Sequence, residues 1–155
     1  MEIRKKKKVD ELITFYEGIM KSIEDLTASP VRMSIQLRVI SGQNLSSETG
    51  DEPISPCVDI QIRGHVADDT KIHKTRIVAD NGWNPFWSSL FHFDIKVPEL
   101  AIIVFTVNDK NRSVASLAMP VLNLPQGYRH VPLTNMFGVP LPKSSIFIHS
   151  KINIY

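Results

Sequence analysis

The sequence predicts an all-β fold, an antiparallel β-sandwich of eight strands preceded by one amphipathic helix. Two patterns of apolar side chains lead to this prediction. Residues 9–26 repeat apolar side chains every three or four positions, whereas the chain from Met33 onward repeats them every second position. The second pattern recurs in short segments with turn-forming residues, and not helices, between them. Short strands of this kind pair antiparallel and pack as two sheets around a common core.

The predicted helix has one apolar stripe, which consists of Val9, Leu12, Ile13, Tyr16, Ile19, Met20, Ile23 and Leu26. Residues 27–30 end it, because Pro30 lacks an amide donor and restricts the residue before it to extended conformations. We therefore divide the chain into residues 1–32, a basic segment with a helix, and residues 33–155, the β domain. We expect the stripe to pack against the sandwich or a neighbouring domain. Self-assembly through it and a membrane contact beside the lysines at 5–8 are the alternatives.

The eight predicted strands cover residues 33–39, 57–63, 71–78, 87–95, 102–107, 116–121, 130–133 and 146–154. The first strand shows the rule: Met33, Ile35, Leu37 and Val39 alternate with polar residues, as a strand with one buried face requires. The same alternation predicts a core that contains Phe91, Phe93, Ile103, Phe105, Val107, Ile146 and Ile148.

Turn-forming residues separate the strands. Residues 141–143, Leu-Pro-Lys, are expected to form one turn. Asn81-Gly82 is expected to form another with positive backbone angles, and Trp83 and Trp87 to supply buried apolar area beside it.

Composition narrows the function. The net charge of +2 is too small to indicate a nucleic-acid reader, whose domains are strongly basic. One cysteine, Cys57, excludes an internal disulfide and a metal site of several thiolates, and it favours a reducing, cytoplasmic location. The sequence has no apolar run of about 18 residues, so any membrane contact is expected to be peripheral.

Five segments carry a resemblance to a known family. In chain order they are Val39-Ile40-Ser41-Gly42-Gln43-Asn44-Leu45, Asn81-Gly82-Trp83-Asn84-Pro85-Phe86-Trp87, Val97-Pro98-Glu99-Leu100, Gly127-Tyr128-Arg129-His130-Val131-Pro132-Leu133 and Ser145-Ile146-Phe147-Ile148. In this order and spacing they resemble the C2 domain of phosphoinositide-specific phospholipase C. Ser55-Pro56-Cys57-Val58 and the short segment after Val107 look most like the epsilon type.

The resemblance implies a C2-type sandwich and a place for calcium. Family members that bind calcium carry Asp-Pro where this chain has Ser55-Pro56, and an Asp-x-Asp pair where it has Asp109-Lys110-Asn111. Asp51, Asp109 and Asn111 are the remaining candidate ligands. Since calcium takes six to eight oxygen ligands, and Lys110 and Arg112 would repel it, we expect no cofactor and no tight calcium binding.

Basic side chains offer another route to an anionic membrane. The candidates for lipid contact are Arg63, Lys71, Lys74, Arg76, Lys110 and Arg112. Aspartates among them dilute this charge, so an ordinary soluble surface is the competing interpretation.

The resemblance also implies a signalling role. Full-length relatives hydrolyse phosphatidylinositol 4,5-bisphosphate in a barrel domain that this sequence does not contain. The five histidines are dispersed and form no HExxH spacing, so we expect no catalytic residue. The hypothesis is a noncatalytic C2 module of an epsilon-like phospholipase C that contacts its barrel, a membrane or a protein. The alternative is a stand-alone lipid- or protein-binding adaptor.

Overall fold

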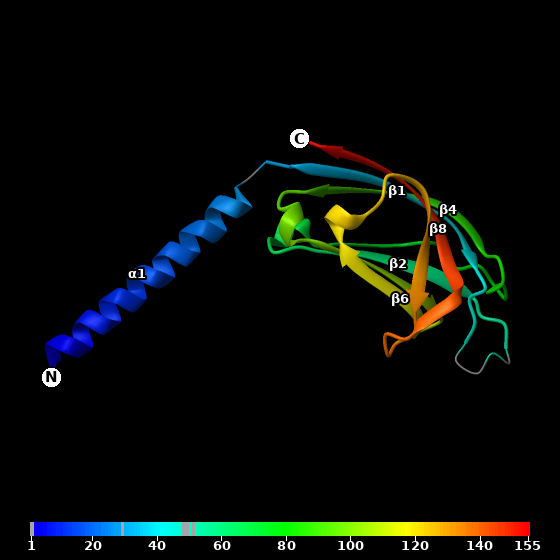
Figure 1. Cartoon of the computed structure of the whole chain (residues 1–155), viewed down its shortest axis with the longest axis horizontal. Helices are drawn as coiled ribbons and strands as arrows, with labels where there is room; N and C mark the ends of the chain where they lie inside the picture. The colour runs from blue at the N-terminus through cyan, green and yellow to red at the C-terminus, as the bar shows by residue number, and fades with distance from the viewer. Residues whose placement is uncertain (1, 29, 48–49, 51) are drawn as a thin grey trace.

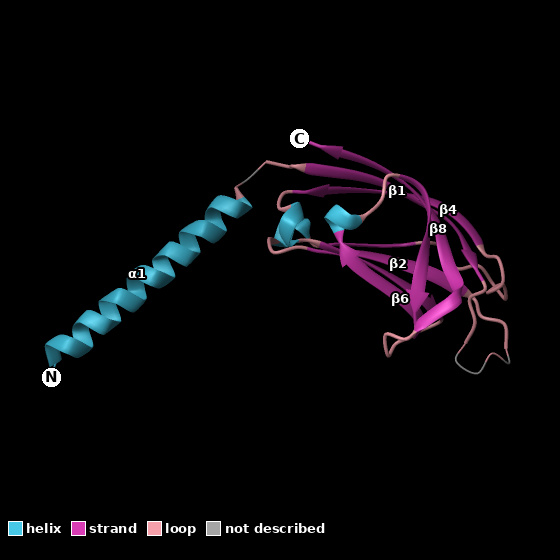
Figure 2. Cartoon of the chain, in the orientation of Figure 1, coloured by secondary structure: helices cyan, strands magenta, loops and turns pink. Residues whose placement is uncertain are grey.

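The computed structural model describes every residue except 1, 29, 48–49 and 51. One long helix, α1 (Glu2–Thr27), leads into a β-domain of eight strands (Figure 1). The strands are β1 (Met33–Gln43), β2 (Pro56–Arg63), β3 (Lys71–Lys74), β4 (Phe86–Ile95), β5 (Ile102–Asp109), β6 (Arg112–Pro120), β7 (Gly127–Thr134) and β8 (Pro140–Ile154). Three short 3-10 helices, η1 (Ala67–Asp69), η2 (Pro98–Leu100) and η3 (Val121–Asn123), interrupt the connections (Figure 2). The predicted fold class is confirmed.

The strands form two antiparallel layers. One layer has the order β3-β2-β5-β6 and the other β7-β8-β1-β4. The layers are joined along one side by a single pairing between Ser116 of β6 and Thr134 of β7, whose hydroxyl donates to the Ser116 carbonyl oxygen at 3.0 Å. The opposite side stays unpaired between the edge strands β3 and β4.

Alternating side chains from both layers fill the core. Of the seven predicted core residues, six are buried, and Phe91 is half-buried and packed against them. The ring of His73 on β3 lies 5.5 Å from that of Phe91 and 5.1 Å from that of Phe93, both on β4. Aromatic packing therefore covers the core on the side where the layers are not hydrogen-bonded.

Every predicted strand differs from the observed one at one boundary or both, by one to six residues, and two of these differences have a clear physical reason. β3 ends at Lys74, because Thr75 turns inward and its hydroxyl accepts a hydrogen bond from the Val58 amide at 2.9 Å. The expected turn at residues 141–143 is wrong, since these residues belong to β8. This part of β8 pairs with β7 alone, because the pairing with β1 stops at Ser145, and prolines are tolerated where one side of a strand is free.

The segment Asn81-Gly82 also differs from expectation. The positive φ, 50°, belongs to Asp80. Gly82 is needed for close approach instead, because a Cβ there would lie 2.2 Å from the Leu45 carbonyl oxygen. Trp87 is buried and its indole N–H donates to the Pro56 carbonyl at 3.2 Å, as a core residue should, but Trp83 is exposed, so the prediction fails for it.

A buried carboxylate ties together the end of the sandwich nearest α1. The carboxylate of Asp69 in η1 accepts hydrogen bonds from the backbone amides of Lys96 at 2.7 Å and Val97 at 2.9 Å. Asp69 is fully buried, and these bonds hold the β2–β3 connection to the end of β4.

Candidate functional site

Four connections gather at the end of the sandwich farthest from α1, which we name the loop end (Figure 1). They are the described residues of 44–55 between β1 and β2, 75–85 between β3 and β4, 110–111 between β5 and β6, and 135–139 between β7 and β8. The register of the antiparallel pairs requires this arrangement, because β5 ends beside the start of β6, and β7 ends beside the start of β8. The start of β2 also lies beside the end of β5, which brings the β1–β2 connection to the same end.

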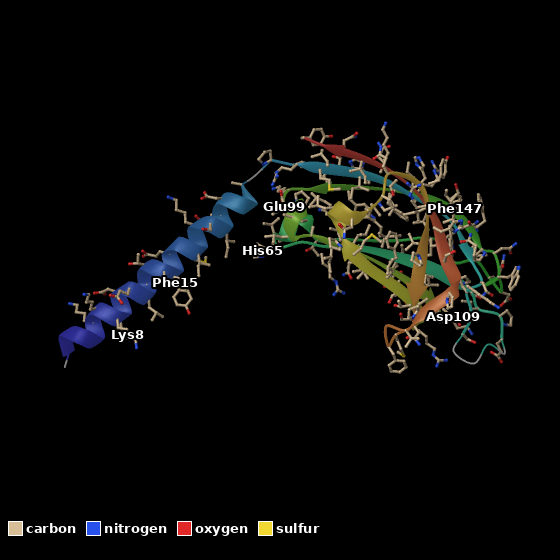
Figure 3. The ribbon with its side chains drawn as sticks, in the orientation of Figure 1. Lys8, Phe15, His65, Glu99, Asp109 and Phe147 are labelled. Carbon is tan, nitrogen blue, oxygen red and sulfur yellow. The ribbon has the colours of Figure 1, made fainter. Side chains whose placement is uncertain are left out.

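Asp109, the candidate metal ligand at the end of β5, has a structural task at this end. Its Oδ1 atom accepts a hydrogen bond from the Ser55 amide at 3.0 Å. The Ser55 hydroxyl in turn accepts one from the Asp80 amide at 3.0 Å. These two bonds connect the β1–β2 loop, β5 and the β3–β4 loop. Figure 3 labels Asp109 at this end of the molecule.

Among the described residues, Asp109 has no partner carboxylates with which it could form a metal-binding cluster. Asn111 lies at the exposed β5–β6 turn, beside Lys110, whose φ of 55° puts it in the left-handed region. Asp51 lies outside the described residues. Within the part of the chain that the structure describes, no group of three or more His, Cys, Asp or Glu side chains could hold a metal ion.

The β7–β8 turn presents apolar side chains on a rigid frame. The side-chain oxygen of Asn135 accepts hydrogen bonds from the amides of Phe137 at 2.9 Å and Val139 at 3.0 Å. The Asn135 amide donates to the Val139 carbonyl at 2.9 Å, and Gly138 supplies the positive φ of 77°. Held in this way, Phe137 is 82% exposed and Met136 is 62% exposed.

The β3–β4 loop presents a second exposed aromatic residue at the same end. The Asn81 side-chain oxygen accepts a hydrogen bond from the Asn84 amide at 3.0 Å, and the Trp83 carbonyl accepts one from the Asn44 amide at 2.8 Å. These bonds fix the backbone of Trp83, yet its side chain is 74% exposed. We call the side chains of Trp83, Met136 and Phe137 the apolar tips.

Three of the six basic candidates lie at the loop end with the apolar tips. Lys110 and Arg112 are exposed at the β5–β6 turn. The guanidinium group of Arg76 donates to the carbonyl of Phe86, the first residue of β4, at 2.6 Å.

The other three basic candidates are dispersed. Lys74 lies opposite Asp59 on β2, and its ammonium group is 3.4 Å from that carboxylate. Arg63, at the other end of β2, donates to the Gln61 side chain. Lys71 lies near the β4 residue Asp94 and helps to lower the pKa of its carboxyl group. The six side chains therefore do not form one patch.

Three titratable groups outside the four connections have a shifted pKa: Asp94, Cys57 and Glu99. The pKa of Glu99 is lowered by a hydrogen bond from its own backbone amide and by one from Arg32. The pKa of Asp94 is lowered, chiefly because the Ser34 hydroxyl donates to its carboxylate at 2.6 Å, with a further contribution from His92. Burial raises the pKa of the Cys57 thiol, and the nearby Asp59 charge adds to this. A raised pKa makes the thiol a weaker nucleophile at neutral pH.

Sequence reasoning missed the apolar tips at Met136 and Phe137. The signal was available, because a run of apolar residues in a connection that contains Asn135 and Gly138 cannot be buried by a tight turn. The turn was expected at residues 141–143, which belong to β8 instead.

The profile of the C2 domain family matches residues 33–130. This chain belongs to the C2 domain family. The predicted resemblance is confirmed, and helix α1 lies outside the matched residues.

Similar proteins relate this C2 domain to phospholipase C. It is 36% identical over 132 residues to 1-phosphatidylinositol 4,5-bisphosphate phosphodiesterase delta-4 of Xenopus laevis, a match that covers 80% of the chain and 17% of that relative. It is 36% identical over 124 residues to the delta-1 protein of Homo sapiens, covering 76% and 16%. The crystal structure of L. pealei PLC21 superposes with a TM-score of 0.72 at 33% identity, over 81% of this chain and 16% of that one. The chain thus spans about a sixth of the length of these relatives.

The described residues contain no helix that is long and apolar enough to cross a membrane.

Proposed function

We propose that this C2 domain is a noncatalytic module that binds anionic phospholipid membranes peripherally through its loop end. The observation that carries the proposal is the pairing of rigid, exposed apolar tips with Lys110 and Arg112 at one end of the sandwich. Aromatic side chains partition into the lipid interface, and each cation near an anionic leaflet contributes about 1 kcal/mol.

A vesicle co-sedimentation assay tests this proposal. The variant Lys110→Glu/Arg112→Glu is compared with Lys151→Glu, which changes an exposed lysine on β8 away from the loop end. Reversal of two cations is expected to weaken binding to phosphatidylserine vesicles by about 30-fold or more, because two attractions become two repulsions. Equal binding by both variants would contradict the proposal. If the wild-type domain does not bind vesicles, a protein partner becomes the better interpretation.

We further infer that membrane binding does not require calcium. Asp109 uses one carboxylate oxygen for the Ser55 amide, and Lys110 is its direct neighbour. A calcium ion needs several such oxygens and is repelled by a nearby ammonium group, so these residues do not fit it. Calorimetric titration of the domain with calcium should give no saturable heat at micromolar concentrations, and a saturable isotherm there would refute the inference.

The parent protein is proposed by similarity. The relatives named above are phosphodiesterases of phosphatidylinositol 4,5-bisphosphate and are about six times longer than the match. We propose that this domain is part of a cytoplasmic enzyme of that kind, which signals by hydrolysing the lipid. Within that enzyme the domain contacts the catalytic barrel. The epsilon subtype stays a prediction based on Ser55-Pro56-Cys57-Val58, whereas the two relatives are delta types.

Two experiments separate these possibilities. Coding sequence for a barrel directly upstream of residue 1 would support the phospholipase C module, and its absence from the transcript would support a stand-alone adaptor. Incubation of the purified chain with phosphatidylinositol 4,5-bisphosphate should release no inositol phosphate. Release at a rate proportional to the concentration of this chain would contradict the noncatalytic assignment.

A further inference from the structure

Two surfaces outside the loop end leave apolar side chains exposed. The first is the stripe of α1, where Val9, Leu12 and Tyr16 are 55%, 49% and 59% exposed. The expected packing of this stripe against the sandwich is therefore wrong, and packing against a neighbouring domain stays a prediction. The second surface is the outer side of strands β7, β8 and β1, and its charges favour one kind of ligand.

Four ring side chains from β7 and β8 form a continuous cluster on this outer side, which we name the ring face. They are Tyr128, His130, Phe147 and His149. The register places Tyr128 opposite His149 and His130 opposite Phe147, and the alternation that buries Ile148 turns these rings outward. The ring centroids of Tyr128 and His149 are 4.4 Å apart, and those of His130 and Phe147 are 4.8 Å apart. Tyr128 is nevertheless 62% exposed, so ring surface remains available to a ligand; Figure 3 labels Phe147 of this cluster.

The strands of the ring face carry basic side chains and no carboxylate. Their basic residues are Arg38 on β1, Arg129 on β7, and Lys143 and Lys151 on β8. None of the three strands contains an aspartate or a glutamate. The neighbouring strand β4 contains one acid, Asp94, whose carboxylate already accepts a hydrogen bond from the Ser34 hydroxyl at 2.6 Å and lies 3.0 Å from His92. The charge of the ring face therefore complements an anionic ligand.

Two of these cations lie beside the rings. Arg38 lies opposite His149 in the register of β1 with β8, and Lys151 follows His149 by two positions, on the same side of β8. The Arg38 guanidinium donates to the Ser88 carbonyl at 3.3 Å and to the Ser88 hydroxyl at 3.2 Å, which are both neutral acceptors. It forms no ion pair with another described residue. Since arginine pairs bidentately with carboxylates, this half-buried group is a ready acceptor site for one from a partner.

We propose that the ring face binds an acidic segment of another protein. Carboxylates of that segment pair with Arg38 and Lys151, and an aromatic side chain beside them packs on Tyr128. The cations are spread along the strands, because Lys143 and Lys151 are eight residues apart, which spans up to about 26 Å. An extended polypeptide reaches cations spread over such a length, whereas one compact phosphate group does not.

An anionic membrane is the competing ligand, and the direction of the strands disfavours it. β1, β7 and β8 run between the loop end and the end nearest α1, so the ring face lies along the side of the sandwich (Figure 1). A domain that contacts lipid through its loop end keeps this side in water. Binding of an acidic segment does not depend on that contact, and its failure would leave the proposed membrane contact untouched.

Fluorescence anisotropy tests the charge of the ring face in the full chain. The probe is a fluorescein-labelled copolymer of glutamate and tyrosine. The wild type should bind it saturably, and Lys151→Glu should weaken binding about 5- to 10-fold, because an attraction becomes a repulsion. The matched control is Lys110→Glu/Arg112→Glu at the loop end, which should bind the probe like the wild type. No binding by the wild type, or an equal loss in the control, would overturn the proposal.

A second pair of measurements tests the rings and the source of the negative charge. Tyr128→Ser should weaken binding of the copolymer about 3- to 10-fold and leave binding of labelled polyglutamate, which has no ring, unchanged. Because cross-strand ring pairs also stabilise a sheet, an equal loss toward both probes would assign Tyr128 a purely structural role and refute the stacking contact. Phosphatidylserine vesicles are then added to the complex of the copolymer with Lys110→Glu/Arg112→Glu. Retention of the probe supports a protein ligand, and its displacement would assign the ring face to lipid and overturn the proposal.

Discussion

Replacement of Phe137 by serine tests whether the β7–β8 turn enters the membrane. Phe137 is 82% exposed, so nearly all of its apolar surface remains available for burial in lipid. Burial of a phenylalanine side chain is worth about 1.5–3 kcal/mol, which corresponds to about a 10- to 150-fold change in partition coefficient. The same exposure means that the sandwich loses little packing, and we expect its unfolding free energy to change by less than about 0.5 kcal/mol.

Tryptophan fluorescence provides the assay. The domain has two tryptophans, of which Trp87 is buried and Trp83 is exposed at the loop end. Titration with phosphatidylserine vesicles should therefore shift the emission of Trp83 to the blue. The Phe137→Ser variant should need at least about 10-fold more lipid to reach half of this shift. Leu100→Ser, an exposed apolar residue in η2 at the other end of the sandwich, should titrate like the wild type. Identical titrations for Phe137→Ser and the wild type would refute the role of the turn.

Three further predictions concern the stability of the sandwich, the first at the loop end and the other two at the end nearest α1. Gly82→Ala should lower the unfolding free energy by about 2–4 kcal/mol, because the new Cβ would meet the Leu45 carbonyl oxygen. Gly138→Ala should lower it by only about 1–2 kcal/mol, through backbone strain at a positive φ. Urea denaturation measures both changes. Asp69→Ala should cost about 2–5 kcal/mol in the same assay, since two buried amides lose their acceptor, and a loss below about 1 kcal/mol would contradict this. The lowered pKa of Asp94 stabilises the fold above its unfolded value near 3.8, and this contribution is lost as the pH falls through the folded value. Asp94→Asn should therefore show a smaller loss of stability than the wild type between about pH 5 and pH 2, and equal losses would remove the assigned role of Ser34.

Local pattern was sufficient to predict most of the fold. Period-two alternation located all eight strands, because most of them have one buried face, and Pro30 marked the end of the helix. The errors arose where a tertiary contact decided the outcome. Position 82 requires glycine because the Leu45 backbone lies against it. The prolines of β8 are tolerated because they lie beyond the part of β8 that pairs with β1. Neither contact can be predicted from a short window of sequence.

The candidate site was harder to predict than the fold. The basic residues could be named from the sequence, but only the register of β2 with β3 shows that Lys74 faces Asp59. Asp109 was read as a possible metal ligand, and its hydrogen bond to the Ser55 amide depends on residues more than fifty positions apart in the chain. Asn135 and Gly138 were a signal for the exposed Met136 and Phe137, whereas the exposure of Trp83 could be seen only in the structure.

Vesicle binding in chelator is the most direct test of the central claim that this C2 domain contacts anionic membranes without calcium. The wild-type chain is mixed with neutral vesicles and with vesicles that contain phosphatidylserine and phosphoinositides, each in calcium and in chelator. We predict equal binding to the anionic vesicles in both conditions and little binding to the neutral ones. Binding that appears only with calcium would contradict the assignment made for Ser55, Asp109 and Lys110.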